Sequence, residues 1–214
     1  MLTSPTQTPL QSLNKAYRKE KVTRAAIDRL KAELPRFLDL TGGDDVSEST
    51  LRDHLQHFLR EVWYPKSDFL VQSEVRRMDT IIHDGPKKKD PVGVIVETKT
   101  RRNSQEMWHP RSRPNAKALH ELVLYFLRER AAGNTAIKSL VITNGDDTYL
   151  FADRDFERLF WEKKRWRKRL LELDADPGKK QRTGSRGYRP PVDREEFLAA
   201  AQVGAAAPEK PTDA

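Results

Sequence analysis

Five short apolar runs predict β-strands in the middle of the chain. The clearest is residues 92–96, where Val92, Val94, Ile95 and Val96 follow one another without a charge. Such a run is typical of a strand that is buried on both faces of a sheet. Polar or Gly/Pro-containing turns separate the runs. The predicted strands are residues 69–72, 79–83, 92–96, 139–143 and 148–151.

Apolar residues spaced three and four apart predict helices before, between and after these strands. The strongest stripe comprises Leu119, Leu122, Val123 and Phe126, and the pair Gly133-Asn134 stops that helix. Ser47 or Ser49 can cap an earlier helix. The predicted helices are residues 13–40, with a possible break at 21–23, 48–62, 115–131 and a basic amphipathic helix over 156–173.

This order of elements predicts the α/β class, with a mixed central sheet flanked by helices. The strand at 92–96, the helix at 115–131 and the strand at 139–143 make one crossover of plausible length, so these two strands should be parallel. Composition divides the chain into a disordered N-terminus (1–11), a folded domain (12–173), a basic Gly/Pro-rich extension (174–198) and a disordered Ala/Pro-rich tail (199–214).

Composition narrows the class of protein. Hydrophobic residues make up 36% of the 214 positions and charged residues 34%. No run approaches the roughly 20 apolar residues that span a bilayer, and the N-terminus lacks a signal-peptide pattern. The absence of cysteine excludes disulfides, cysteine-ligated zinc, iron–sulfur clusters and a thiol nucleophile. We therefore expect a cytoplasmic protein.

The basic charge is concentrated near the C-terminus. The net charge is +8, and residues 154–194 hold 14 basic and seven acidic side chains. A local excess of this kind indicates an anionic partner, most commonly nucleic acid. Four of its cations, together with an arginine pair on the loop after residue 99, are candidate contacts to DNA phosphates. These candidates are Arg101, Arg102, Lys163, Lys164, Arg167 and Lys168.

The buried strand at 92–96 runs directly into Glu97, Thr98 and Lys99. Residues 97 and 99 project from the same face of an extended chain. If residues 79–83 form a hairpin with this strand, Asp79 can lie opposite Glu97, and two adjacent carboxylates favour a divalent cation such as Mg²⁺ between them. That arrangement would support phosphodiester hydrolysis. The alternative is an ordinary strand end with a surface Glu–Lys pair that contributes under about 1 kcal/mol.

The stretches DTIIHDG, PVGVIVETKTRRNSQEM, NAKALHELVLYFLRER and IKSLVITNGDDTYLFADRDFERLF resemble the N-terminal endonuclease region of fused restriction–methylation enzymes of type IIG. NKAYRKEKVTR and LRDHLQHFLREVWY resemble it too, so the similarity covers roughly residues 14–165. These enzymes belong to the PD-(D/E)XK nuclease superfamily. The proline often found before the motif aspartate is replaced here by Met78.

The resemblance implies a restriction-endonuclease-like core, a Mg²⁺-dependent DNA endonuclease and a prokaryotic source. Asp79, Glu97 and Lys99 match the catalytic Asp, Glu and Lys, and the magnesium ligands would be Asp79, Glu97 and the Thr98 carbonyl. Longer relatives would carry methyltransferase and target-recognition domains, which have no counterpart in these 214 residues, and two copies could act together on DNA as a homodimer. Further active-site side chains in the superfamily match Glu48 or Glu61, and Lys117, Glu121 or Tyr125.

Each of these further residues has a plainer interpretation as part of a solvated helix face. His54 and His57, one helical turn apart, lack a third ligand and do not indicate a zinc site. Two other function classes stay open: a non-catalytic nucleic-acid-binding module on the same fold, and a regulatory or assembly domain with a docking tail. The complete Asp79, Glu97 and Lys99 set favours the enzyme, since a binding module has no need to keep all three.

Overall fold

The computed structural model describes residues 19, 21–75, 78–109, 112–113 and 116–168 of the chain. The predicted tails at 1–11 and 199–214 and the extension at 174–198 lie outside the described residues, as does the start of the helix predicted at 13–40. None of the helices within the described ranges combines the length and the apolar character needed to cross a bilayer.

A five-stranded mixed sheet forms the centre of the molecule, in the order β1-β2-β3-β4-β5. The predicted parallel pair is confirmed: β3 runs parallel to β4, and every other neighbouring pair is antiparallel. The strands are β1 (Leu70–Val75), β2 (Met78–His83), β3 (Val92–Thr98), β4 (Ser139–Thr143) and β5 (Thr148–Ala152). The mixed α/β class predicted from the sequence is therefore confirmed.

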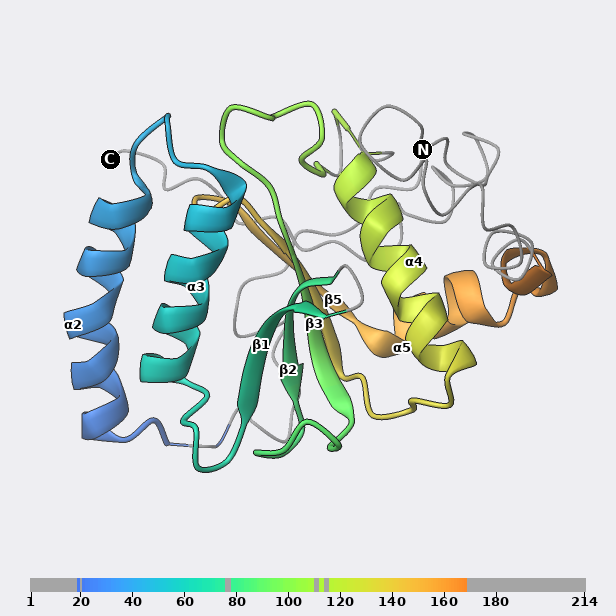
Figure 1. Ribbon diagram of the computed structural model, residues 1–214, viewed down its shortest axis with the longest axis horizontal. Coiled ribbons are helices and arrows are strands. Elements are labelled where there is room, and N and C mark those ends of the chain that lie inside the picture. Colours follow the sequence, from blue (N-terminus) through green and yellow to red (C-terminus); the bar gives the residue numbers. More distant parts are fainter. Residues whose placement is uncertain (1–18, 20, 76–77, 110–111, 114–115, 169–214) are drawn as a thin grey trace.

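Three long helices accompany the sheet: α2 (Arg24–Thr41), α3 (Glu48–Val62) and α4 (Lys117–Ala131). Thr23 caps α2, so the predicted break at 21–23 is the beginning of this helix. The Ser47 hydroxyl accepts a hydrogen bond from the Thr50 N–H and thereby caps α3. Figure 1 shows α2 and α3 on one side of the sheet and α4 on the other.

The prediction of one continuous helix over 156–173 was wrong for the residues that the structure describes. The segment comprises a short α5 (Asp153–Phe156), a π-helical turn η1 (Glu157–Trp161) and a further helical stretch at 164–168. Phe160 and Trp166 are both buried and pack edge to face, with their ring centroids 5.4 Å apart. In one regular helix they would point about 120° apart, so the irregular turn lets both side chains reach the core.

The two faces of the sheet pack against different helices. Ile81, Ile95 and Leu140 are fully buried in the core that also contains the apolar side of α4. The alternate face is covered by α3, where the Gln56 amide donates to the Thr80 hydroxyl. Because Asp79 and Glu97 are two residues from Ile81 and Ile95, their side chains share the α4 face at the end of the sheet.

Candidate active site

The polar cluster begins where β3 ends. The Lys99 N–H donates to the Thr143 carbonyl, 2.9 Å away, so the chain stays extended and paired with β4 beyond Thr98. Glu97 and Lys99 are therefore on the same face, as the sequence pattern predicted. Both side chains are almost completely buried, with 1% and 2% of the residue exposed. Burying two charged groups is costly unless each is paired, so their surroundings decide what the site can do.

Asp79 joins this cluster from β2. The β2–β3 register pairs Thr80 with Val96, which places Asp79 one position further on, opposite Glu97. Its Oδ2 accepts a hydrogen bond from the Thr98 N–H, 2.9 Å away. The structure thus brings Asp79, Glu97 and Lys99 together around one point, through a hairpin whose loop lies at the other end of the two strands.

The Lys99 ammonium lies at the centre of the cluster. It is hydrogen-bonded to Glu97 Oε1 and to the Thr98 carbonyl oxygen, the latter at 3.2 Å. Glu121 Oε2 lies 3.0 Å from it and Glu48 Oε1 3.7 Å. Glu48 comes from the first turn of α3 and Glu121 from α4, so the ends of two helices from opposite sides of the sheet converge on one ammonium.

Carboxylates outnumber the cations at this point, and the pKa values reflect it. Burial, opposed by Lys99 and reinforced by Asp79 and Glu121, raises the pKa of Glu97 well above its ordinary value. Burial also raises the pKa of Asp79 and of Glu48. Burial alone would lower the pKa of Lys99, but the carboxylates of Glu97, Glu121 and Glu48 outweigh it and raise that pKa. The cluster therefore favours additional positive charge, either a proton or a metal ion.

The raised pKa of Glu97 predicts how the stability of the metal-free protein depends on pH. In the folded state Glu97 holds its proton above pH 4.5, its ordinary pKa, where the unfolded chain has released it. The free energy of unfolding should consequently fall as pH rises from there toward the raised pKa. Urea unfolding in EDTA between pH 5 and 8 measures this slope, and Glu97→Gln should flatten it. An unchanged slope in that variant would contradict the assignment.

The residues fit an oxygen-liganded cation. Glu97 Oε2 is buried and accepts no hydrogen bond from a described residue, and the Glu121 carboxylate lies close enough to share a proton with Glu97, so a cation could take the place of that proton. Asp79, Glu97 and the Thr98 carbonyl supply the hard oxygen ligands that Mg²⁺ prefers. Within the described ranges, no group of three His, Asp or Glu side chains is arranged to hold a metal ion. The Lys99 ammonium contacts Glu97 and the Thr98 carbonyl oxygen, two of the three proposed ligands, so a cation bound by them would displace it.

Some of the additional residues proposed from the superfamily resemblance lie in the Lys99 cluster and others lie outside it. Glu48 and Glu121 reach Lys99, whereas Glu61 is exposed on α3. Lys117 pairs with Glu106 at 2.8 Å and with Glu121 at 3.8 Å, which places it at the margin of the cluster. Tyr125 is buried on the same helix. The plainer interpretation of this part of α4 as a solvated outer face was therefore wrong.

Arg52 belongs to the site but was missed by the sequence reasoning. It lies on α3 one turn after Glu48, so the two side chains share a face of the helix. Its guanidinium pairs with Glu74 at 2.8 Å and approaches Asp79 Oδ1 at 3.6 Å. The spacing of four from Glu48 was available in the sequence, but nothing there marked this arginine among the 40 basic residues of the chain.

The candidate DNA contacts have different environments. Arg102, Lys163, Lys164 and Lys168 are exposed. The Arg167 guanidinium stacks over the Trp161 ring, 5.3 Å from its centroid. Trp166 packs in the core, so it is not available for stacking on bases. The exposed lysines therefore remain the strongest candidates in this segment.

Arg101, also predicted to contact DNA phosphates, is engaged in contacts within the protein. Its guanidinium binds the Asp146 carboxylate and the Thr41 carbonyl, which ties the end of α2 to the β4–β5 turn. We expect Arg101→Gln to lower the free energy of unfolding by about 1–3 kcal/mol, because a charged hydrogen-bonding partner is lost. Arg102→Gln should leave stability nearly unchanged and lower DNA affinity. Urea unfolding and DNA titration of both variants measure this, and a stable Arg101→Gln protein with weakened DNA binding would reverse the assignment.

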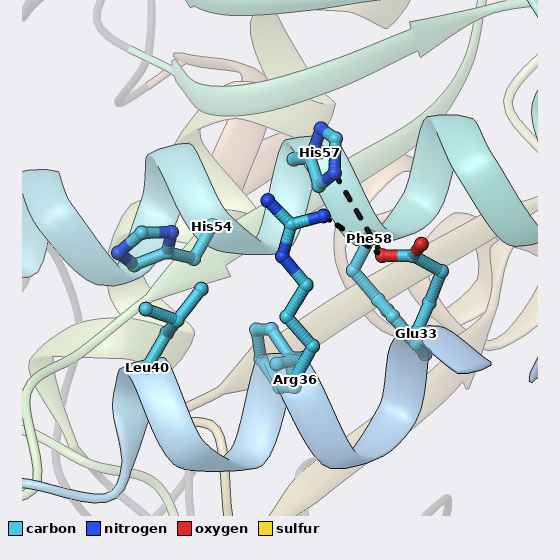
Figure 2. Close-up of a pocket in the computed structure, with 7 residues that line it drawn as sticks. Glu33, Arg36, Leu40, His54, His57 and Phe58 are labelled. Carbon is cyan, nitrogen blue, oxygen red and sulfur yellow. Dashed lines mark ion pairs between the residues drawn. The ribbon is translucent and has the colours of Figure 1, made fainter. Parts of the chain in front are cut away.

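A separate pocket lies between α2 and α3, and both charged and apolar side chains line it. Figure 2 shows the Arg36 guanidinium between His54 and His57. Glu33 Oε2 lies 3.7 Å from His57 and 3.9 Å from Arg36, so one carboxylate partners both side chains. The arginine guanidinium occupies the space between the two histidines.

Comparison with known proteins identifies the family of this mixed α/β protein. A family model described as a domain of unknown function (DUF7149) matches residues 7–186, which is most of the chain. The protein therefore belongs to this family. No curated protein and no solved structure shows significant similarity to it.

Proposed function

We propose that the protein is a Mg²⁺-dependent DNA endonuclease of restriction type that hydrolyses phosphodiester bonds. The observation that supports this most is the convergence of Asp79, Glu97 and Lys99 at the end of β3, with more carboxylates than the one central ammonium can neutralise. An isolated surface Glu–Lys pair would be solvated, whereas these side chains are buried and their pKa values are shifted together. Clustered shifts of this kind are typical of functional sites.

The proposed roles follow from the positions of the atoms. Asp79, Glu97 and the Thr98 carbonyl would hold Mg²⁺, and the Thr98 N–H keeps Asp79 oriented through its hydrogen bond to Oδ2. When bound, Mg²⁺ would polarise the phosphoryl oxygen and make a coordinated water more acidic. Lys99, displaced from the centre, would orient the attacking water or stabilise the charge that develops on the phosphate. Glu48 and Glu121 would keep the Lys99 side chain charged and close to the reaction.

The same proposal includes the finer fold assignment. The helix pair, the β1–β3 meander and the β3–α4–β4 crossover are compatible with a PD-(D/E)XK core, and the resemblance to the endonuclease region of type IIG enzymes supports that core. In such enzymes target recognition and methylation would reside in further domains, and two copies of the nuclease would cut the two strands. DNA is accordingly the proposed partner.

Plasmid nicking tests the proposed function. Wild-type protein should convert supercoiled DNA to nicked or linear forms in Mg²⁺ but not in EDTA, and Glu97→Gln should be inactive. Glu61→Gln is the matched control, because Glu61 is an exposed glutamate on α3 outside the cluster. DNA binding by wild-type protein without any Mg²⁺-dependent cleavage would instead favour the non-catalytic binding module.

The exposed lysines at the C-terminal end of the described chain predict salt-sensitive DNA binding. A triple charge reversal of Lys163, Lys164 and Lys168 should weaken binding and flatten the plot of log affinity against log salt by about 0.9 per lost phosphate contact. Fluorescence anisotropy with two unrelated duplexes measures both effects, and the duplexes should bind about equally, since phosphate contacts carry no sequence information.

Reversal of Lys87, Lys88 and Lys89 is a matched control for that experiment. These lysines are also exposed, but they lie in the β2–β3 loop at the end of the hairpin away from Glu97. If this control weakens binding as much as the C-terminal reversal, the proposed DNA surface is wrong. The basic segment would then fit the docking tail of a regulatory or assembly domain.

A further inference from the structure

Arg52 connects the candidate metal site with the exposed edge of the sheet. Its side chain is only 12% exposed, and its two terminal nitrogens face Glu74 at 2.8 Å and Asp79 at 3.6 Å. Its Nε is buried and has no hydrogen-bond partner among the residues that the structure describes. A guanidinium offers five N–H donors, so this one has unused hydrogen-bonding capacity directly beside the cluster.

Glu74, the closer partner, has an unusual backbone. Its φ of 54° lies in the left-handed region, and it is the one non-glycine residue with positive φ among those described. Such a conformation costs about 1–3 kcal/mol and occurs preferentially at functional sites. The Glu74 side chain is 71% exposed, so packing does not explain the conformation. The contact that the structure shows for this side chain is the ion pair with Arg52.

The contact with Asp79 is the weaker one. At 3.6 Å it exceeds hydrogen-bond length, so it is held by charge alone. If Asp79 binds a divalent cation, its negative charge is no longer available to Arg52, and the positive charge nearby repels the guanidinium. Only the exposed pair with Glu74 then holds Arg52, and exposed pairs contribute little.

We propose that Arg52 is a substrate-binding residue that the metal-free protein stores against Glu74 and Asp79 and that turns to the DNA phosphate once Asp79 holds a cation. This inference rests on the proposed nuclease function and adds a residue to it. The planar guanidinium can bind two non-bridging phosphate oxygens at once, which a lysine cannot do. Cation binding and substrate binding would thereby be coupled through one side chain.

The test is DNA affinity with and without a cation that supports binding, measured by anisotropy in Ca²⁺ and in EDTA. Arg52→Gln should lower the affinity by about tenfold in Ca²⁺, the loss of one charged hydrogen-bond pair, and change it little in EDTA. Arg29→Gln, an exposed arginine on α2, is the matched control and should change little in either buffer. An equal loss in both buffers, or no loss in Ca²⁺, would overturn the proposal.

Glu74→Gln should change DNA affinity in the opposite direction to Arg52→Gln. This second test remains valid even if Arg52→Gln fails to fold. Once Asp79 holds a cation, Glu74 is the remaining partner of Arg52, so Glu74→Gln should raise DNA affinity in Ca²⁺ several-fold more than Glu61→Gln, which removes an exposed charge elsewhere. If Glu74→Gln and Glu61→Gln changed DNA affinity equally, the proposal that Glu74 holds Arg52 away from DNA would be wrong.

Calorimetric titration of Ca²⁺ tests the proposed metal site and the proposed role of Arg52 separately. We expect Arg52→Gln to bind Ca²⁺ at least as tightly as wild type, since it removes a competing positive charge from Asp79. Weaker Ca²⁺ binding would mean that Arg52 is structural and would overturn this inference alone. If the wild-type protein binds no Ca²⁺ that Asp79→Asn abolishes, the proposed metal site fails, and the role of Arg52 fails with it.

Discussion

Asp79→Asn should abolish divalent-cation binding and DNA cleavage while leaving the fold intact. Asparagine retains a side-chain oxygen that can accept the Thr98 N–H hydrogen bond, so the β2–β3 hairpin keeps its geometry. The substitution removes one of the charges that burial disfavours at this site. In EDTA at neutral pH the variant should therefore unfold at the same temperature as wild type or slightly higher.

Thermal unfolding with and without Mg²⁺ measures this prediction, alongside plasmid cleavage. Wild-type protein should be stabilised by Mg²⁺, because a ligand that binds only the folded state raises its stability. The variant should show no such shift. A large loss of stability of Asp79→Asn in EDTA would assign Asp79 a structural role, with the Arg52 ion pair as its main function.

Lys99→Met should produce the largest loss of stability in the metal-free protein. The substitution removes the ammonium that partners Glu97, Glu121 and Glu48, and unpaired buried charges are strongly destabilising. We expect the free energy of unfolding at neutral pH to fall by about 3–5 kcal/mol. Cleavage should be lost as well, even in saturating Mg²⁺.

Two conditions should rescue the stability of Lys99→Met. Acid pH protonates the carboxylates, and Mg²⁺ supplies replacement positive charge, so either should recover much of the loss. Lys117→Met is the matched control, because Lys117 pairs at the more exposed margin of the cluster and should cost far less. A loss that neither acid nor Mg²⁺ relieves would indicate packing of the lysine stem as the cause, and would argue against an electrostatic cation site.

The strands and the main helices were predictable because their signals are local. The apolar run at 92–96 and the apolar stripe at 119–126 each predict a buried element. The structure contains them as β3 and as the buried side of α4. The proximity of Asp79 and Glu97 was predictable as well, since a hairpin around the loop at 84–91 can place them opposite one another, although the register shift between Ile82 and His83 was not predictable. These parts depend on residue periodicity and short-range connection alone.

The remainder of the site depends on long-range packing that no local pattern encodes. Glu48, Arg52 and Glu121 reach the cluster only because α3 and α4 approach the same end of the sheet from opposite sides. Each is one charged residue among many on a helix, so its partner cannot be inferred from spacing. The structural role of Arg101 was hidden for the same reason, because its partners Thr41 and Asp146 are 60 and 45 residues away.

Anomalous diffraction from crystals of the protein grown with Mn²⁺ tests the central claim most directly, because it locates the cation and the Lys99 side chain together. The account predicts an anomalous peak bound by Asp79, Glu97 and the Thr98 carbonyl, with the Lys99 ammonium moved away from its present position between Glu97 and Glu121. A fully occupied Lys99 in that position and no peak at these three ligands, in crystals saturated with Mn²⁺, would contradict it.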